Sequence, residues 1–139
     1  MLVLCTGNSA RSQMAEGIFR SMFGDRFDVF SAGTEPSIVR PEAIAAMAEI
    51  GIDISGHRSK SVDEFRDREI DLVITVCDNA RENCPYFPAR SKLIHHSFPD
   101  PAATHGDDAT RLASFRSVRD EIQAYAEEEL SDVISELQM

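Results

Sequence analysis

Cys5 and Arg11 stand six residues apart in the stretch CTGNSARS, which directly follows the apolar run LVL. A thiolate is a strong nucleophile, and a guanidinium is a planar fork that holds two oxygens of an anion without losing its charge. Gly7 permits a backbone conformation that other residues resist. The spacing therefore predicts a loop that binds a tetrahedral oxyanion beside a reactive sulfur. A buried structural cysteine with an unrelated surface arginine is the alternative.

This chemistry requires a strand before the loop and a helix after it. MLVLC is a short uncharged strand, and apolar residues recur at helical spacing from Ser12 until Gly24, a suitable helix end. The N-terminus of such a helix favours an anion and lowers the pKa of a nearby cysteine. We therefore predict an oxyanion site made of Thr6, Gly7, Asn8, Ser9, Ala10, Arg11 and Ser12.

The rest of the chain alternates predicted strands and helices. FDVFSAG (27–33), DLVITVC (71–77) and KLIHH (92–96) are predicted strands, and helices are predicted from Pro41 to Gly51 and from about Asp108 onward. This order indicates one α/β domain over residues 1–139, with a parallel sheet flanked by helices on both faces. Ligands of such sheets bind beyond the carboxyl ends of the strands. Cys5 and Cys77 both end predicted strands, so we expect them at the same sheet edge.

The composition limits the partners. The chain has 139 residues and a formal net charge of −10, from 24 acidic and 14 basic residues. This charge argues against nucleic acid, and no apolar run approaches the ~18 residues of a membrane span. The N-terminus has no secretory signal, so we expect a cytoplasmic protein. We also expect a monomer that uses no cofactor and no metal. An oxyanion must then be attracted by a local positive field.

Cys77 and Cys84 stand seven residues apart in CDNARENC. The gap is longer than in common zinc sites, and permanent disulfides are rare in the cytosol, so a redox pair fits better. If the segment between them is helical, the two Cα atoms lie ~10 Å apart, which is beyond the about 7 Å that a disulfide tolerates. We therefore predict that oxidation refolds residues 78–90.

Asp100 stands between two prolines, which fix it in a rigid turn. The residues alone are equally compatible with an ordinary turn and with a proton donor that faces a bound anion, where its pKa would be raised. His57, His95 and His96 have no evident partner in the sequence, and we interpret them as structural. His105 lies in a polar loop near Asp100.

The segment CTGNSARSQMAEG resembles the phosphate-binding loop of the low-molecular-weight protein tyrosine phosphatase superfamily, and within it the thioredoxin-coupled arsenate reductases. The likeness continues through SAGTEPS, GIDISGHRSKS, DLVITVCDNARENCP, FPDPA and SFRSVRDEI, so it spans nearly the whole chain. It implies a four-stranded parallel sheet flanked by helices.

The resemblance also implies a mechanism. Arsenate would bind in the loop, Cys5 would attack it with help from Ser12, and Asp100 would be the general acid. Cys77 and then Cys84 would resolve the intermediate, and thioredoxin would reduce the final disulfide, with phosphate or sulfate as competing anions. A protein tyrosine phosphatase and an oxyanion- or redox-sensing binding module are the alternatives. Ala102 stands where such phosphatases usually place an aromatic residue after Asp-Pro, which favours the reductase.

Two positions depart from the resembling family. Many of these reductases carry a cysteine where this chain has Ala10. Some bind potassium through positions that match Asn8, Glu16 and Ser31, together with an acid where this chain has Lys60. An ammonium there would pair with Glu16 in place of the cation, so we predict that activity does not depend on potassium. A solvated surface lysine is the alternative.

Overall fold

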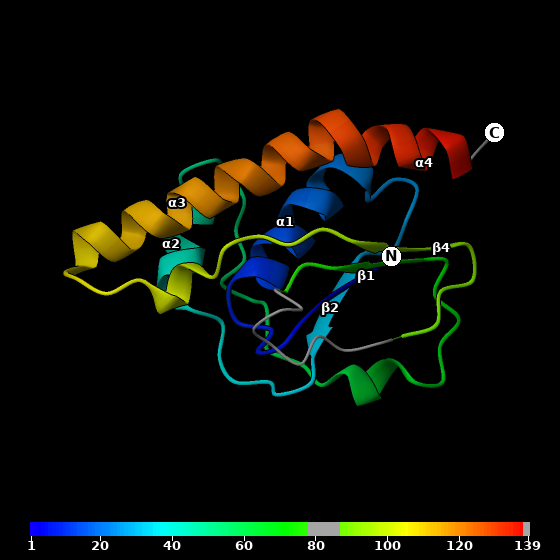
Figure 1. Ribbon diagram of the computed structural model, residues 1–139, viewed down its shortest axis with the longest axis horizontal. Helices are drawn as coiled ribbons and strands as arrows, with labels where there is room; N and C mark the ends of the chain where they lie inside the picture. The colour runs from blue at the N-terminus through cyan, green and yellow to red at the C-terminus, as the bar shows by residue number, and fades with distance from the viewer. Residues whose placement is uncertain (78–86, 138–139) are drawn as a thin grey trace.

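The computed structural model describes residues 1–77 and 87–137 of the chain, which form a parallel sheet covered by helices (Figure 1). Its strands are β1 (Leu2–Cys5), β2 (Phe30–Gly33), β3 (Leu72–Thr75) and β4 (Lys92–His95), in the spatial order β2-β1-β3-β4. All three pairings are parallel, so the predicted four-stranded sheet is confirmed. Each strand is shorter than the predicted run, β2 and β3 by three residues and β1 and β4 by one.

The helices begin close to the signals in the sequence, and the first also ends at its predicted glycine, whereas the second ends at Ala48, before the predicted stop at Gly51. α1 (Arg11–Phe23) ends where the N–H of Gly24 donates to the carbonyl of Arg20 at 2.9 Å. α2 (Pro41–Ala48) starts at a proline, as expected for a first helical position, and Gly51 follows it with a φ of 79°. α3 (Asp108–Tyr125), the π-helical turn η3 (Ala126–Leu130) and α4 (Ser131–Leu137) form one continuous rod. Within the described ranges, no helix has the length and apolar character needed to cross a membrane.

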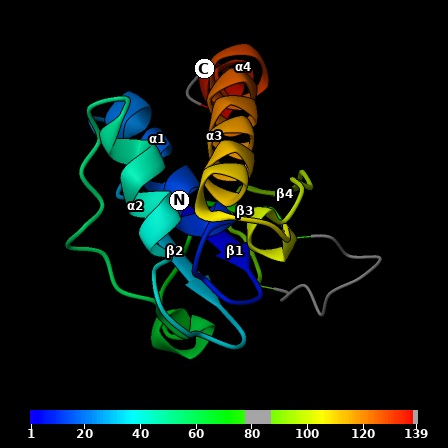
Figure 2. The same cartoon turned by 90° about the vertical axis from the view of Figure 1, so that its left-hand side faces the viewer.

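The three long helices cover one face of the sheet, and the 3₁₀ helix η1 (Val62–Phe65) covers the other (Figure 2). Because successive strand side chains point to opposite faces, β1 contributes to two cores. Val3 packs in the core that contains Phe19 and Phe115 from the helices. Leu4 packs on the other face, in the cluster that contains Phe65. Burial on both faces explains why β1 and β3 read as continuous apolar runs, whereas β4, at the edge of the sheet, is mostly exposed.

The strand order places a change in winding direction within the sheet. The chain leaves β1 toward β2 on one side, whereas β4 lies on the other side of β3. The winding therefore reverses between β1 and β3, which is where sheets of this kind bind ligands. The loop after β1 lies at this point, and Cys5 and Cys77 share the edge, as predicted.

Candidate active site

The loop between β1 and α1 joins the candidate nucleophile to the candidate anion clamp. Cys5 is the last residue of β1 and is a buried, reduced thiol. Arg11 is the first residue of α1, and only 4% of its side chain is exposed. The first N–H groups of a helix have no partner within the helix, so they and the helix dipole favour negative charge at this loop.

Arg11 and Asp100 come together at the mouth of the loop although they lie far apart in the sequence. Nη1 of Arg11 donates to the carbonyl of Phe98 at 3.4 Å, and Nη2 lies 3.9 Å from Oδ2 of Asp100. The other carboxylate oxygen of Asp100 accepts the N–H of Ala102 at 3.0 Å, which caps the 3₁₀ helix η2 (Pro101–Ala103). The side chain of Asp100 is 41% exposed, so solvent reaches it.

Asn8 fixes the shape of the loop. It is fully buried and has a φ of 45°, a left-handed conformation that asparagine tolerates better than most residues. Its Nδ2 donates to the hydroxyls of Ser12 and Ser31, each at 2.9 Å. Its Oδ1 accepts from Nε2 of Gln13 at 2.9 Å and from the N–H of Lys60 at 2.8 Å. These bonds use both amide protons and both lone pairs, so the loop has one defined conformation.

A second layer of polar side chains lies beneath Asn8. Ser31 donates to Oε1 of the buried Glu16 at 2.9 Å, and Nζ of Lys60 lies 3.5 Å from the same oxygen. Oε2 of Glu16 lies 3.3 Å from Arg20 and 3.0 Å from Nδ1 of His57. The predicted pairing of Lys60 with Glu16 is therefore confirmed, and the alternative of a solvated lysine is wrong because only 11% of its side chain is exposed.

His57 belongs to this layer, which its sequence position did not indicate. Its Nδ1 lies 3.0 Å from Oε1 of Gln13, and its Nε2 lies 3.2 Å from Nη1 of Arg20. Because a guanidinium can only donate, Nε2 accepts and the ring is the neutral tautomer with its proton on Nδ1. Burial lowers the pKa of His57, with smaller contributions from Arg20 and Lys60, against the opposing effect of Glu16. The histidine is structural, as predicted, and supports the loop.

The segment 33–40 holds the loop from outside through backbone hydrogen bonds that the sequence did not reveal. The N–H groups of Glu35 and Arg40 donate to the carbonyls of Thr6 and Ser9, both at 2.9 Å. A Cβ at Gly33 would lie 2.4 Å from the carbonyl oxygen of Thr6, so only glycine allows the end of β2 to approach the loop. The motif SAG thus has a packing function.

Cys77 follows β3 and is fully buried in the same core cluster as Cys5. Cys77 is disulfide-bonded whereas Cys5 is a reduced thiol, so the two are not bonded to each other. Cys84 lies outside the described residues, as does most of the segment 78–90 whose refolding the sequence predicts.

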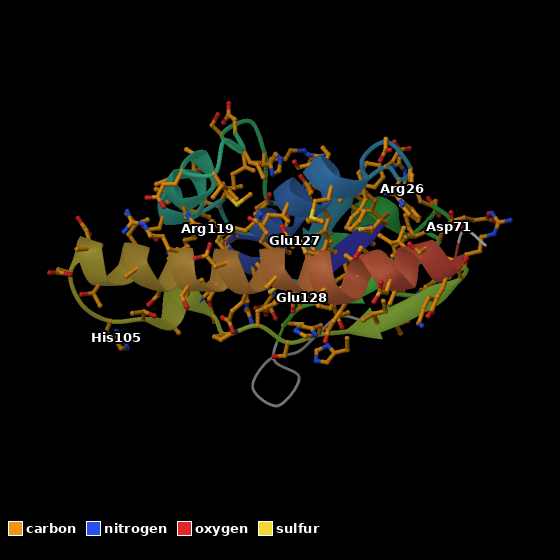
Figure 3. All side chains as sticks on the ribbon, turned by 90° about the horizontal axis from the view of Figure 1, so that it is seen from above. Arg26, Asp71, His105, Arg119, Glu127 and Glu128 are labelled. Carbon is orange, nitrogen blue, oxygen red and sulfur yellow. The ribbon has the colours of Figure 1, made fainter. Side chains whose placement is uncertain are left out.

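The remaining histidines lie around the strand that leads to Asp100. Nδ1 of His95 is 2.6 Å from the hydroxyl of Thr75, and His96 stacks on Tyr125 with 4.1 Å between ring centroids. Burial and the nearby Glu129 raise the pKa of Tyr125 to about 12. Both histidines are structural, as predicted, whereas His105 is exposed on the turn before α3 (Figure 3).

The geometry supports attack on a tetrahedral oxyanion. A thiol, a guanidinium and a helix N-terminus surround one loop, and a carboxyl group lies at its mouth. Such a set can bind the anion, form a bond from sulfur to its central atom and protonate a departing oxygen.

Comparison with known proteins gives consistent results over the whole chain. The family model described as low molecular weight phosphotyrosine protein phosphatase matches residues 1–139. The chain is 50% identical over 119 residues to an arsenate reductase of Halalkalibacterium halodurans and 46% identical over 119 residues to one of Bacillus subtilis, with 86% of each chain covered. A solved structure described as an arsenate reductase in the phosphate binding state superposes with a TM-score of 0.75 at 32% identity, over 94% of this chain and 95% of that one.

Proposed function

The chain belongs to the low molecular weight phosphotyrosine protein phosphatase family, and we propose that within this family it is an arsenate reductase. The observation that carries the proposal is the position of Cys77 just after β3, the strand beside β1, which ends at Cys5. A phosphatase needs one nucleophile and ends with hydrolysis, whereas a reductase needs further thiols that deliver two electrons.

The strand register supports direct exchange between these two cysteines. Leu4 pairs with Thr75, and the N–H of Val76 donates to the carbonyl of Leu4 at 2.9 Å. Cys77 is therefore one residue beyond the position opposite Cys5. With strands ~4.8 Å apart and ~3.3 Å per residue, the two Cα atoms are about 6 Å apart, within the range of a disulfide.

In the first step, arsenate occupies the loop and Arg11 holds two of its oxygens. The Cys5 thiolate attacks arsenic and forms a sulfur–arsenic bond, while Asp100 protonates the oxygen that leaves as water. Ser12 stabilises the thiolate before attack. Its Oγ accepts from Asn8, so its own proton is available to the sulfur. Arsenic remains in the pentavalent state in this step.

The second step transfers the electrons. The Cys77 thiolate attacks the sulfur of Cys5, the sulfur–arsenic bond breaks, and its electron pair stays on arsenic, which leaves as arsenite. The resulting Cys5–Cys77 disulfide is attacked by Cys84, which restores the Cys5 thiol. Thioredoxin then reduces the Cys77–Cys84 disulfide. A disulfide at Cys77 together with a reduced Cys5 is the distribution expected after the attack by Cys84 and before the reduction by thioredoxin.

The decisive experiment follows NADPH oxidation with thioredoxin, thioredoxin reductase and arsenate. We expect sustained turnover that stops after about one arsenite per enzyme in Cys84→Ser. Continued thioredoxin-driven turnover in that variant would refute the relay. Efficient hydrolysis of an aryl phosphate without any reductant, and no arsenate reduction, would favour the phosphatase. Anion binding without either activity would favour the sensing module.

The setting of this reaction is a further part of the proposal. The relay needs a reducing compartment that supplies a dithiol protein, which fits the bacterial cytoplasm. The thiols and the carboxyl group supply all the chemistry, so no cofactor or metal is required. The site uses residues of one chain, so a monomer suffices.

A further inference from the structure

Arg40 is held against the outer side of the anion loop. Its N–H donates to the carbonyl of Ser9 at 2.9 Å, and it occupies the N-cap position of α2, directly before Pro41. Its side chain takes no part in capping the helix. In Figure 2, α2 lies on one side of the start of α1 and η2, which carries Asp100 at its N-cap, lies on the other. The helices that Arg40 and Asp100 precede therefore lie on opposite sides of the start of α1.

The side chain of Arg40 lacks the partners that the other arginines have. In the described part of the chain, the buried side-chain polar atoms without a hydrogen-bond partner are Thr6 Oγ1 and Arg40 Nε. Thr6 belongs to the anion loop, and the backbone of Arg40 is bonded to Ser9 of the same loop. Every other described arginine either lies within 4.0 Å of a carboxylate or, in the case of Arg68, stacks on Phe30 at 4.9 Å and on Phe65 at 5.8 Å.

A positive charge without a carboxylate is unusual on a chain whose net charge is −10. Acidic residues are abundant, and nearby Glu42 is paired with Arg111 at 3.5 Å. A buried N–H without an acceptor is costly, so such a group is expected where a ligand compensates it. The anion loop is bonded to the backbone of Arg40, and this loop holds the negatively charged ligand during the catalytic cycle.

We infer that Arg40 is a specificity-determining residue whose charge makes the loop prefer a doubly charged oxyanion. The inference rests on the proposed oxyanion site. Arg11 grips the anion directly, whereas Arg40 adds positive potential from the outer side of the loop and attracts the second negative charge. Arg40 takes no part in bond making, so its loss affects binding and leaves the chemical step unchanged.

The expected effect depends on the charge of the ligand. A unit charge at the rim of a partly buried site changes the affinity for a dianion by about tenfold. Because the free energy scales with ligand charge, the affinity for a monoanion changes by about threefold. If a residue only shapes the loop, its substitution reduces the affinity for the monoanion and the affinity for the dianion by the same factor.

Titration calorimetry with inorganic phosphate tests this inference without the thiol relay. Phosphate is mainly a monoanion at about pH 5.5 and mainly a dianion at about pH 8. The variants are Arg40→Gln, Arg40→Lys and, as a matched control that removes the same charge from an arginine without a carboxylate partner, Arg68→Gln. Thermal unfolding of each variant shows whether it is folded.

We expect Arg40→Gln to bind phosphate about threefold more weakly than the wild type at the lower pH and about tenfold more weakly at the higher pH. Arg40→Lys should recover most of the affinity, and Arg68→Gln should match the wild type. With arsenate as substrate, Arg40→Gln should raise KM and leave kcat unchanged. A ratio that does not change with pH, or equal losses in Arg40→Gln and Arg68→Gln, would overturn the inference.

The outcome separates this inference from the proposed function. A wild type that binds phosphate with the predicted dependence on Arg40 but never reduces arsenate refutes the reductase and supports the role of Arg40. A reductase whose phosphate affinity is the same with and without the Arg40 charge refutes only the inference.

Discussion

Replacing Lys60 by methionine removes a charge from beneath the anion loop while keeping most of the side-chain volume. Nζ of Lys60 lies 3.5 Å from Oε1 of Glu16 and donates to the carbonyl of Arg58 at 3.0 Å. The side chain of Glu16 is only 4% exposed, so water cannot replace the lost partner easily. The variant therefore leaves a buried carboxylate with less compensation, and we expect it to lower the free energy of unfolding.

The size of the loss follows from the contacts that remain. Two unit charges about 4 Å apart attract each other by about 4 kcal/mol at an effective dielectric constant near 20. Desolvation of the ammonium in the folded wild type offsets part of this attraction, and Arg20 still lies 3.3 Å from Glu16 in the variant. We therefore expect a loss of about 2 kcal/mol. For a domain of this size, the melting temperature should fall by about 7 °C.

Thermal unfolding in sodium chloride and in potassium chloride at equal ionic strength provides the measurement. Lys92→Met is the control because Lys92 is exposed on β4. The wild type should unfold at the same temperature in both salts, and its activity should not respond to potassium. Lys60→Asp, which places a carboxylate beside Glu16, should be stabilised more by potassium than by sodium.

Two results would refute this reasoning. If Lys60→Met costs no more stability than Lys92→Met, the pair with Glu16 is not a significant interaction. If potassium activates the wild type several-fold over sodium, the ammonium of Lys60 does not replace a cation.

Three further substitutions test the site. Asp100→Asn should lower kcat for arsenate reduction about 10²–10³-fold with little change in KM, because it removes the acid but keeps the cap of η2; a change confined to KM would contradict the role. Burial lowers the pKa of His57 from its ordinary value of 6.5. When the pH falls through that region, His57 takes up a proton more readily in the unfolded chain than in the folded chain, so the free energy of unfolding decreases. His57→Gln should make unfolding by urea less pH-dependent there, and an unchanged profile would argue against it. Asn8→Ala should cost about 1 kcal/mol more than Asn8→Gly in the same assay, because alanine resists the positive φ of 45°; equal losses would show that the left-handed backbone is unimportant.

The sequence predicted the parts of the fold and site that depend on local patterns. The loop from Cys5 to Ser12 has the strand before it and the helix after it that its spacing required. The strand end at 77 was predicted too late and the start at 27 too early, because apolar residues continue beyond the hydrogen-bonded ladder, whereas the end at 33 was predicted correctly. Val76, for example, is buried and donates to Leu4 although it lies outside β3.

The sequence could not predict the support of the loop because it depends on contacts between distant segments. Gln13 bonds the carbonyl of Arg58, 45 residues away, and the N–H of Lys60 bonds Asn8, 52 residues away. Neither residue type predicts such a contact, since glutamine and lysine are common at exposed helix and loop positions. The clue that the sequence did offer was the small residue at Gly33, whose lack of a Cβ indicates a close backbone approach.

The buried carboxylate of Glu16 determines which groups donate and which accept in the hydrogen-bond network beneath the loop. As an ionised group it can only accept, so Ser31 must donate to it and can accept only from Nδ2 of Asn8. The amide of Asn8 is thereby oriented, and its second proton goes to Oγ of Ser12. Ser12 is left with its own proton to donate, and it lies in the first turn of the helix that follows Cys5. A negative charge beneath an anion site would oppose binding if Lys60 and Arg20 did not neutralise it. In the proposed mechanism, an acidic residue thus orients the hydroxyl that assists the thiolate, while the positive field of the loop is kept for the anion.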